Sequence, residues 1–214
     1  MAFLFESFEG WKDYCIKNQM TLEQVVLEYE HQQKGRTPEE THIGLQKAWE
    51  VMKDAVRTGL EEDMTSRSGM INNGAKKVYH YPKAVLSKEF QQLISRALAA
   101  KEVNSCMGRV VAAPTAGASG IMPGVLYTLQ EIHRLDDNKV IDAMLIAAGI
   151  ALIMEQKASI SGAVGGCQAE TGTAAAMGAG AIVFCLDGNT EQVFNAVAIT
   201  VSSCPPDGAL YDQP

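Results

Sequence analysis

The charged side chains of this 214-residue sequence are concentrated in its first half. Residues 1–100 carry 27 of the 43 charged side chains, whereas the 61 residues from 140 to 200 carry six. Because ionised side chains are seldom buried without a partner, we expect the second half to form the interior. Hydrophobic residues make up 47% of the sequence and charged residues 20%. These values are typical of a globular protein and exclude a disordered or collagen-like chain.

Helical signals recur along the whole sequence. Apolar residues follow a three-and-four spacing over residues 45–56, over Phe90, Leu93, Ile94, Ala97 and Leu98, and over residues 125–132. Helix starts are predicted at Thr21 with Gln24, at Thr37 with Pro38 and Glu40, and at Asn189 with Gln192. No alternation of useful length indicates a strand. The sequence therefore predicts a mainly α fold with buried Ala/Gly-rich core helices, in one domain spanning residues 1–214.

The apolar run at residues 140–154 is interpreted as a buried core helix. Its 15 residues fall short of the roughly 20 that cross a bilayer. After it, residues 168–185 are rich in Ala and Gly, whose small side chains let helices approach closely. Membrane insertion is disfavoured because Glu155, Lys157 and Glu170 interrupt the apolar region.

The net charge, the amino terminus and the cysteines limit which binding partners and which cellular compartment we expect for this protein. A net charge of −7 and a pI near 5.1 provide no basic surface, so nucleic acid is not an expected partner. Glu6 interrupts the amino terminus before a signal-peptide run develops, which predicts a cytoplasmic protein. The five scattered cysteines are interpreted as thiols or metal ligands and not as a disulfide framework.

Three glycine-rich segments are predicted to form loops at or between helix ends. They are the first segment at residues 68–77 (SGMINNGAKK), the second at 113–120 (APTAGASG) and the third at 161–170 (SGAVGGCQAE). Backbone N–H groups and hydroxyls just before a helix favour a carboxylate or another anion. Flexible connection between helices is the alternative interpretation of any one segment. Nucleotide binding is disfavoured, because no Gly-Lys-Ser/Thr follows the glycines and no dinucleotide fingerprint follows a strand.

Cys167 is the most suggestive single residue. It follows two glycines and precedes a helix whose positive dipole end favours a thiolate. A buried, inert cysteine is the alternative, and Cys15, Cys106 and Cys185 are interpreted as packing residues. The four histidines show no metal-ligand spacing. Asp142 and Glu155, 13 residues apart on one helix, are interpreted as structural.

Residues 104–124 (NSCMGRVVAAPTAGASGIMPG) closely resemble the signature of bacterial iron-sulfur-dependent L-serine dehydratase α chains. The third segment and the Ser-Gly…Gly-x-Ala-Lys-Lys pattern of the first segment resemble the same family, in the family's order. The resemblance covers about residues 10–200. It implies a lyase that converts L-serine to aminoacrylate, and then to pyruvate and ammonia. It also implies a four-iron, four-sulfur (4Fe-4S) cluster as Lewis acid, without pyridoxal phosphate.

The resemblance assigns roles to particular residues. Cys167 matches the family's first cluster ligand. Ser68, Thr115 and Ser119 would hold the carboxylate and ammonium of L-serine, and Lys76 would pair with the carboxylate. The resemblance leaves the general base unidentified. It suggests a β subunit or a second copy of the chain as partner.

The sequence departs from the family near its end. The family's remaining ligands lie in a Cys-Asp-Pro…Pro-Cys segment, whereas residues 201–208 read VSSCPPDG, in which Cys204 resembles that segment faintly. We therefore expect a truncated chain whose cluster is incomplete or absent. Two alternatives stay open, a cysteine desulfidase-like lyase and an inactive helical remnant. Pyridoxal-phosphate dehydratases are disfavoured because their α/β fold needs alternating strands.

Overall fold

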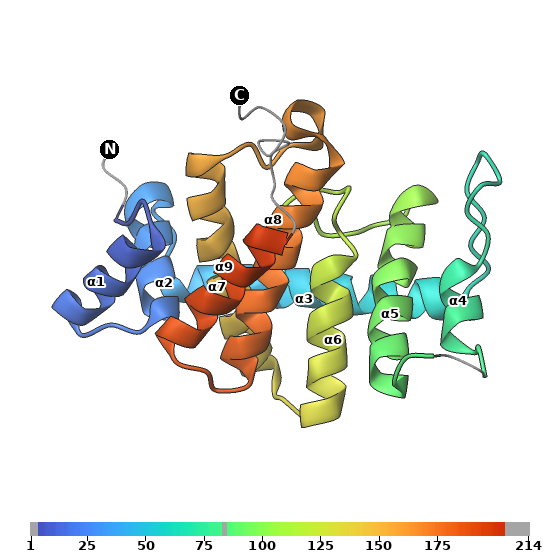
Figure 1. Cartoon of the computed structure of the whole chain (residues 1–214), viewed down its shortest axis with the longest axis horizontal. Coiled ribbons are helices and arrows are strands. Elements are labelled where there is room, and N and C mark those ends of the chain that lie inside the picture. The colour runs from blue at the N-terminus through green and yellow to red at the C-terminus, as the bar shows by residue number, and fades with distance from the viewer. Residues whose placement is uncertain (1–3, 83–84, 204–214) are drawn as a thin grey trace. The chain divides into compact units, whose positions relative to one another are not determined.

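The computed structural model describes residues 4–82 and 85–203. Its residues are 73% helical, and the described part contains no strand, which confirms the mainly α prediction (Figure 1). The helices are α1 (Phe8–Asn18), α2 (Leu22–Lys34), α3 (Pro38–Glu61), α4 (Gly74–Tyr79), α5 (Lys88–Ser105), α6 (Ile121–His133), α7 (Asp137–Lys157), α8 (Gly162–Cys185) and α9 (Thr190–Ser203). The chain divides into two compact units, one of Met1–Gln46 with Asp137–Pro214 and one of Lys47–Asp136. The single-domain organisation stays a prediction.

The predicted helix starts are confirmed by reciprocal side-chain caps. Thr21 forms a capping box with Gln24 at the start of α2, and Asn189 exchanges hydrogen bonds of 2.8 and 2.9 Å with Gln192 at α9. At α3, the Thr37 N–H donates to Glu40 (2.9 Å) and the Thr37 hydroxyl accepts from the Glu40 N–H (3.2 Å). Each box satisfies two N–H groups that the first turn of a helix leaves unpaired.

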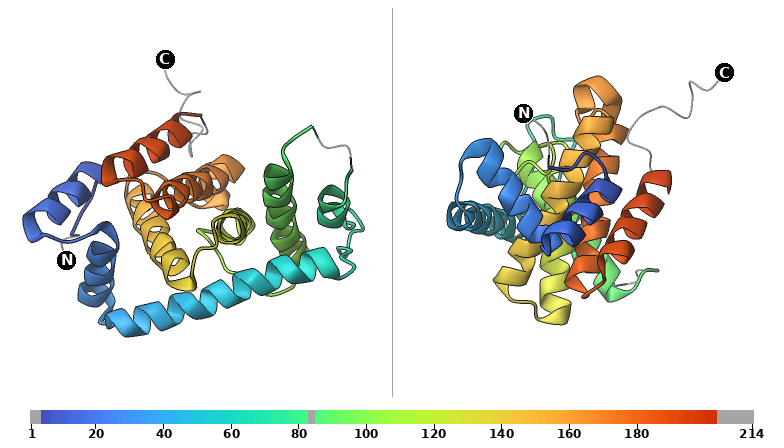
Figure 2. Two further views of the ribbon diagram at one scale, coloured as in Figure 1. Left: turned by 90° about the horizontal axis from the view of Figure 1, so that it is seen from below. Right: turned by 90° about the vertical axis from the view of Figure 1, so that its left-hand side faces the viewer.

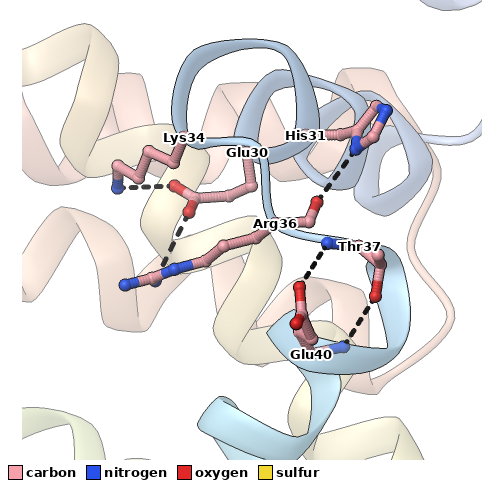
Figure 3. Close-up of polar contacts among 6 residues, drawn as sticks. All are labelled: Glu30, His31, Lys34, Arg36, Thr37 and Glu40. Atoms are coloured by element: carbon pink, nitrogen blue, oxygen red, sulfur yellow. Dashed lines mark hydrogen bonds and ion pairs between the residues drawn. The ribbon is translucent and has the colours of Figure 1, made fainter.

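The turn between α2 and α3 carries a compact ionic network (Figure 3). The Glu30 carboxylate accepts from Lys34 Nζ at 2.8 Å and lies 3.7 Å from the Arg36 guanidinium. His31 Nδ1 lies 3.1 Å from the Arg36 carbonyl oxygen. These contacts fix the short connection through which the chain enters the 24 residues of α3.

The first unit is built on the apolar second half of the chain, as the charge distribution predicts. Helix α8 packs against both α7 and α9, which can be followed in orange, gold and red in Figure 2. Eleven residues of α7 are buried, which confirms the core helix expected at residues 140–154. Gly180 of α8 allows the close approach, because a Cβ there would lie 2.3 Å from Ile150 Cδ1. Among the described residues, no helix is long and apolar enough to cross a bilayer.

In the second unit, α5 lies between α4 and α6 (Figure 1). Its predicted apolar face is partly wrong, since Phe90 is 51% exposed and Leu98 37% exposed. The buried face instead includes Arg96 and Glu102. The reason is that α5 faces backbone groups and hydroxyls of its neighbours, which need polar partners and would be left unsatisfied by an apolar stripe.

Small residues and one arginine fasten α5 to the helices around it. Gly59 of α3 packs on the α5 backbone, because a Cβ there would lie 2.4 Å from the Ala99 carbonyl oxygen. Arg96 donates to the Thr128 hydroxyl of α6 at 2.9 Å and pairs with Glu131. Helix α5 therefore has a fixed position within this unit.

Candidate functional site

The first glycine-rich segment forms the end of a tight turn and the start of a helix. Residues Thr65 and Asn72 form an isolated antiparallel bridge, and Gly69 turns the chain with a φ of +73°. The sequence predicts a loop through residue 77, but α4 begins at Gly74. Helix α4 forms there because a partner outside the segment accepts its first N–H groups, as shown below.

Ser68 and Lys76 occupy opposite ends of the first segment. Ser68 is exposed, and its hydroxyl lies 3.2 Å from the hydroxyl of buried Ser66. Lys76 Nζ donates to Asp63 at 2.9 Å, and the Asp63 side chain is 87% exposed. The Lys76 side chain is 22% exposed, and an ion pair whose carboxylate is so accessible to water contributes little free energy. The Lys76 ammonium can therefore exchange Asp63 for another carboxylate at small cost.

The second glycine-rich segment is a loop, as predicted, and leads directly into α6. The Thr115 hydroxyl accepts from the Ala118 N–H at 3.3 Å. Ser119 is 1% exposed, and within the described residues its hydroxyl has no hydrogen-bond partner. A buried hydroxyl without a partner carries a free-energy cost. Ser119 is therefore a polar group that a ligand could satisfy.

The last turn of α5 contacts both of these segments. The Glu102 carboxylate accepts from the N–H groups of Gly74 (2.7 Å) and Ala75 (3.2 Å). Lys101 Nζ donates to the Gly117 carbonyl oxygen at 2.7 Å, and Asn104 Nδ2 donates to that of Ala116 at 2.9 Å. The roles of Lys101 and Glu102 are not recognisable from the sequence, because a charged residue in a helix is usually interpreted as solvent-exposed.

The third glycine-rich segment is helical and broken at one residue. Helix α8 begins at Gly162, capped by the Ser161 hydroxyl, and Gly166 interrupts it with φ +75° and ψ −178°. Cys167 follows the break and is exposed. The segment is thus one helical turn and a kink, where the sequence predicts a loop. Glycine permits this backbone because an L-residue at such a φ is strained.

The described cysteines differ in environment. Burial raises the pKa of Cys185 to about 11, and burial together with the nearby Glu23 carboxylate raises that of Cys15 to about 11. A raised pKa disfavours the thiolate that binds metal. Cys106 is half-buried, and Cys204 lies outside the described residues. Cys167 is thus the described cysteine whose exposure best suits ligation.

The structure brings four of the five predicted site residues into one unit. Ser68, Lys76, Thr115 and Ser119 belong to the unit of residues 47–136, and Cys167 belongs to the other. Within residues 4–82 and 85–203, no three His, Cys, Asp or Glu side chains form a group able to hold a metal ion. The predicted roles of the five residues stay predictions.

Comparison with known proteins places the chain in a family. A family model described as "Serine dehydratase alpha chain" matches residues 17–204. The L-serine dehydratase alpha chain of Peptoniphilus asaccharolyticus is 34% identical over 210 residues, covering 94% of this chain and 72% of that relative. A probable L-serine dehydratase alpha chain of Bacillus subtilis is 34% identical over 219 residues, covering 99% and 73%.

A third relative extends well beyond the matched region. The L-serine dehydratase of Streptomyces coelicolor is 34% identical over 204 residues, which cover 88% of this chain and 44% of that relative. The family match spans all three glycine-rich segments. The family model matches most of the chain, and the chain is 34% identical to the two alpha chains. The protein therefore belongs to the serine dehydratase alpha chain family.

Proposed function

We propose that this chain takes part in the dehydration of L-serine to pyruvate and ammonia, as an L-serine ammonia-lyase. The proposal rests on the family match over residues 17–204, together with relatives that are named L-serine dehydratases. The structure adds an arrangement suited to a small zwitterion. The first and second glycine-rich segments lie against one helical turn, and they carry hydroxyls, backbone N–H groups and two ammonium groups, those of Lys76 and Lys77.

The reaction requires two bonds to break in a bound amino acid. The Cα proton leaves to a base, and the Cβ–O bond breaks with loss of water, which yields aminoacrylate. Water then hydrolyses this product to pyruvate and ammonia. The chain's contribution is to hold the carboxylate and ammonium so that the departing hydroxyl and the Cα proton are correctly oriented.

The described residues suggest how the substrate would be held. Lys76 would leave its exposed pair with Asp63 and bind the serine carboxylate. The buried Ser119 hydroxyl would gain the partner that it lacks among the described residues, and the exposed Ser68 hydroxyl would contact the ammonium. Thr115 would complete the site beside Ser119. No described residue is assigned as the general base.

The family resemblance implies a 4Fe-4S cluster, which would act as a Lewis acid on the hydroxyl. Cys167 is the described residue that suits ligation, since it is exposed and begins a helical segment. Such clusters are usually held by cysteine at most corners. The described residues alone therefore do not complete the ligand set of such a cluster.

We infer two further properties from the relatives and the chemistry. Since two relatives are named alpha chains, we propose that a β chain, or a second copy of this chain, is its partner. A reducing compartment would keep the exposed Cys167 thiol available for metal, and we therefore propose a cytoplasmic location.

An anaerobic assay of the iron-loaded protein together with its β chain tests the function. We expect pyruvate from L-serine, and loss of its formation in Cys167→Ala while the helical circular-dichroism spectrum is unchanged. Faster release of sulfide from L-cysteine would instead assign a desulfidase. No product from either substrate, combined with no iron uptake, would assign a non-catalytic role.

A further inference from the structure

We propose that the last turn of α5, residues 101–104, positions the first and second glycine-rich segments for substrate binding, with Glu102 as the main positioning residue. This inference rests on the proposed function. The residues of this turn are not expected to touch the substrate. They act on the site through the backbone of the two segments.

Glu102 supplies a cap that α4 lacks. Asn73 precedes α4 but makes no side-chain cap, because its Oδ1 accepts from the Met64 N–H at 2.6 Å. The Glu102 Oε1 atom accepts from the N–H groups of Gly74 and Ala75 instead. A carboxylate at a helix start is stabilised both by these hydrogen bonds and by the helix dipole. Glu102 therefore fixes the helix on which Lys76 lies.

The contact between Glu102 and α4 is close and buried. Glu102 is 5% exposed, and a Cβ at position 74 would lie 2.8 Å from its Oε1. Glycine at position 74 thus allows the carboxylate to reach the backbone. The Oε2 atom is buried and has no partner among the described residues. In the described contacts, the Glu102 carboxylate accepts hydrogen bonds from the α4 backbone.

The same turn holds the second segment through different side chains. Lys101 and Asn104 lie three positions apart, hence on one side of the helix, whereas Glu102 is rotated by about 100° from Lys101. Lys101 and Asn104 donate to two successive carbonyl oxygens, those of Gly117 and Ala116. The second segment is also pressed on α5 at its end, because a Cβ at Gly120 would lie 2.2 Å from the Ala97 carbonyl oxygen.

One rigid turn therefore sets the spacing between the two segments. Lys76 lies one residue beyond the N–H groups that Glu102 binds, and Ser119 lies two residues beyond the carbonyl that Lys101 binds. A change in this turn would move the Lys76 ammonium relative to the Ser119 hydroxyl. Because the substrate would bridge these groups, its affinity depends on α5.

Hydrogen exchange of the purified chain and kinetics of the full enzyme test the proposal together. Glu102→Gln keeps an oxygen that accepts both N–H groups, whereas Glu102→Ala removes it. We expect Glu102→Ala to speed exchange of the Gly74 and Ala75 amides at least about tenfold, and Asn104→Ala to speed exchange over residues 115–119. Glu102→Gln and the control Ser105→Ala, whose hydroxyl bonds to the Lys101 carbonyl within α5, should leave both regions unchanged.

In the assembled enzyme, Glu102→Ala should lower kcat/KM for L-serine about 10- to 100-fold, mainly through KM, and Glu102→Gln should restore it to within about threefold. Equal loss in both variants would overturn the proposal and make Glu102 an ionising catalytic group. Unchanged exchange in Glu102→Ala would also overturn it. If the parental enzyme converts no serine, the proposed function fails and the exchange data decide the positioning role.

Discussion

Gly149 of α7 leaves the space that the indole ring of Trp11 occupies. A Cβ at position 149 would lie 2.2 Å from the Cη2 atom of that ring. Trp11 is fully buried and stacks on Phe5 with ring centroids 4.8 Å apart. Helix α1 therefore packs on α7 because Gly149 has no side chain at the position that the Trp11 ring occupies.

Gly149→Ala should destabilise the protein by about 1–3 kcal/mol, because a rigid buried ring cannot yield to the added methyl group. The free energy of unfolding in urea measures the effect. Gly44→Ala is the matched control, since Gly44 is exposed in α3 with nothing within 4 Å of its built Cβ. It should stabilise by about 0.5–1 kcal/mol. Equal effects at the two positions would contradict the packing at Trp11.

Arg96→Leu should cost about 1.5–3 kcal/mol, the usual value for hydrogen bonds that involve a charged group. Arg96 contacts Thr128 and Glu131 at once, and its guanidinium lies 5.0 Å from the centre of the Tyr127 ring. Arg96→Lys keeps the charge but not the planar fork. The free energy of unfolding of Arg96→Lys should lie between that of the parent and that of Arg96→Leu. If Arg96→Lys is as stable as the parent, the positive charge alone accounts for the stabilisation.

Thiol labelling at pH 8 should modify Cys167 first. With a pKa of about 11, Cys15 and Cys185 would have about 0.1% thiolate at that pH. Mass spectrometry of peptides, in a Cys204→Ser background, should show alkylation of Cys167 at least about tenfold faster than that of Cys185. Raising the pH increases thiolate at Cys185, so the ratio should narrow. Fast labelling of Cys185 in the native chain would contradict its burial.

If the proposed function holds, Lys76→Gln should lower kcat/KM for L-serine about 10- to 100-fold, because the proposed charge-assisted hydrogen bond to the substrate carboxylate would be lost. The loss should appear mainly in KM. Lys47→Gln serves as control, since Lys47 is exposed in α3 of the same unit. If both variants have parental kinetics, Lys76 does not bind the carboxylate.

Glu89→Gln should weaken the fold in a pH-dependent way. The carboxylate's hydrogen bond from its own backbone N–H, and then that from the Ser87 hydroxyl, lower the pKa of Glu89. A carboxyl group whose pKa is lower in the folded state than in the unfolded state stabilises the fold at pH values above its unfolded-state pKa, which is about 4.3. This stabilisation is lost as the pH falls through the pKa of the folded state. Urea midpoints should therefore differ from the parent at pH 7 and converge near pH 3. An equal deficit at both pH values would exclude this ionic cap.

The sequence allowed the elements to be predicted better than their buried faces. Caps such as Thr37 with Glu40 are local and depend on side chains three residues apart, so their pattern is readable. The burial of Glu102, with Phe90 exposed, depends on groups far away in the chain, such as the Gly74 N–H 28 positions before it. No local periodicity contains that information.

The candidate site shows the same difference. The residues of the three glycine-rich segments were recognisable as motifs, and four of the five fall in one unit. The side chains that hold the first two segments were not, because Lys101 and Glu102 resemble an ordinary solvated helix surface. The break at Gly166 was also hidden, since glycine pairs permit many backbone conformations.

The break in α8 at Gly166 affects how the direction of the Cys167 side chain depends on the residues before it. In an uninterrupted helix, one inserted residue would turn everything beyond it by about 100°. In α8 this rotation need not pass beyond Gly166, because the helical backbone is interrupted there and a second helical part begins at Cys167. We therefore expect an insertion or deletion ahead of position 166 to change the direction of the Cys167 side chain less than one within the buried remainder of α8 would.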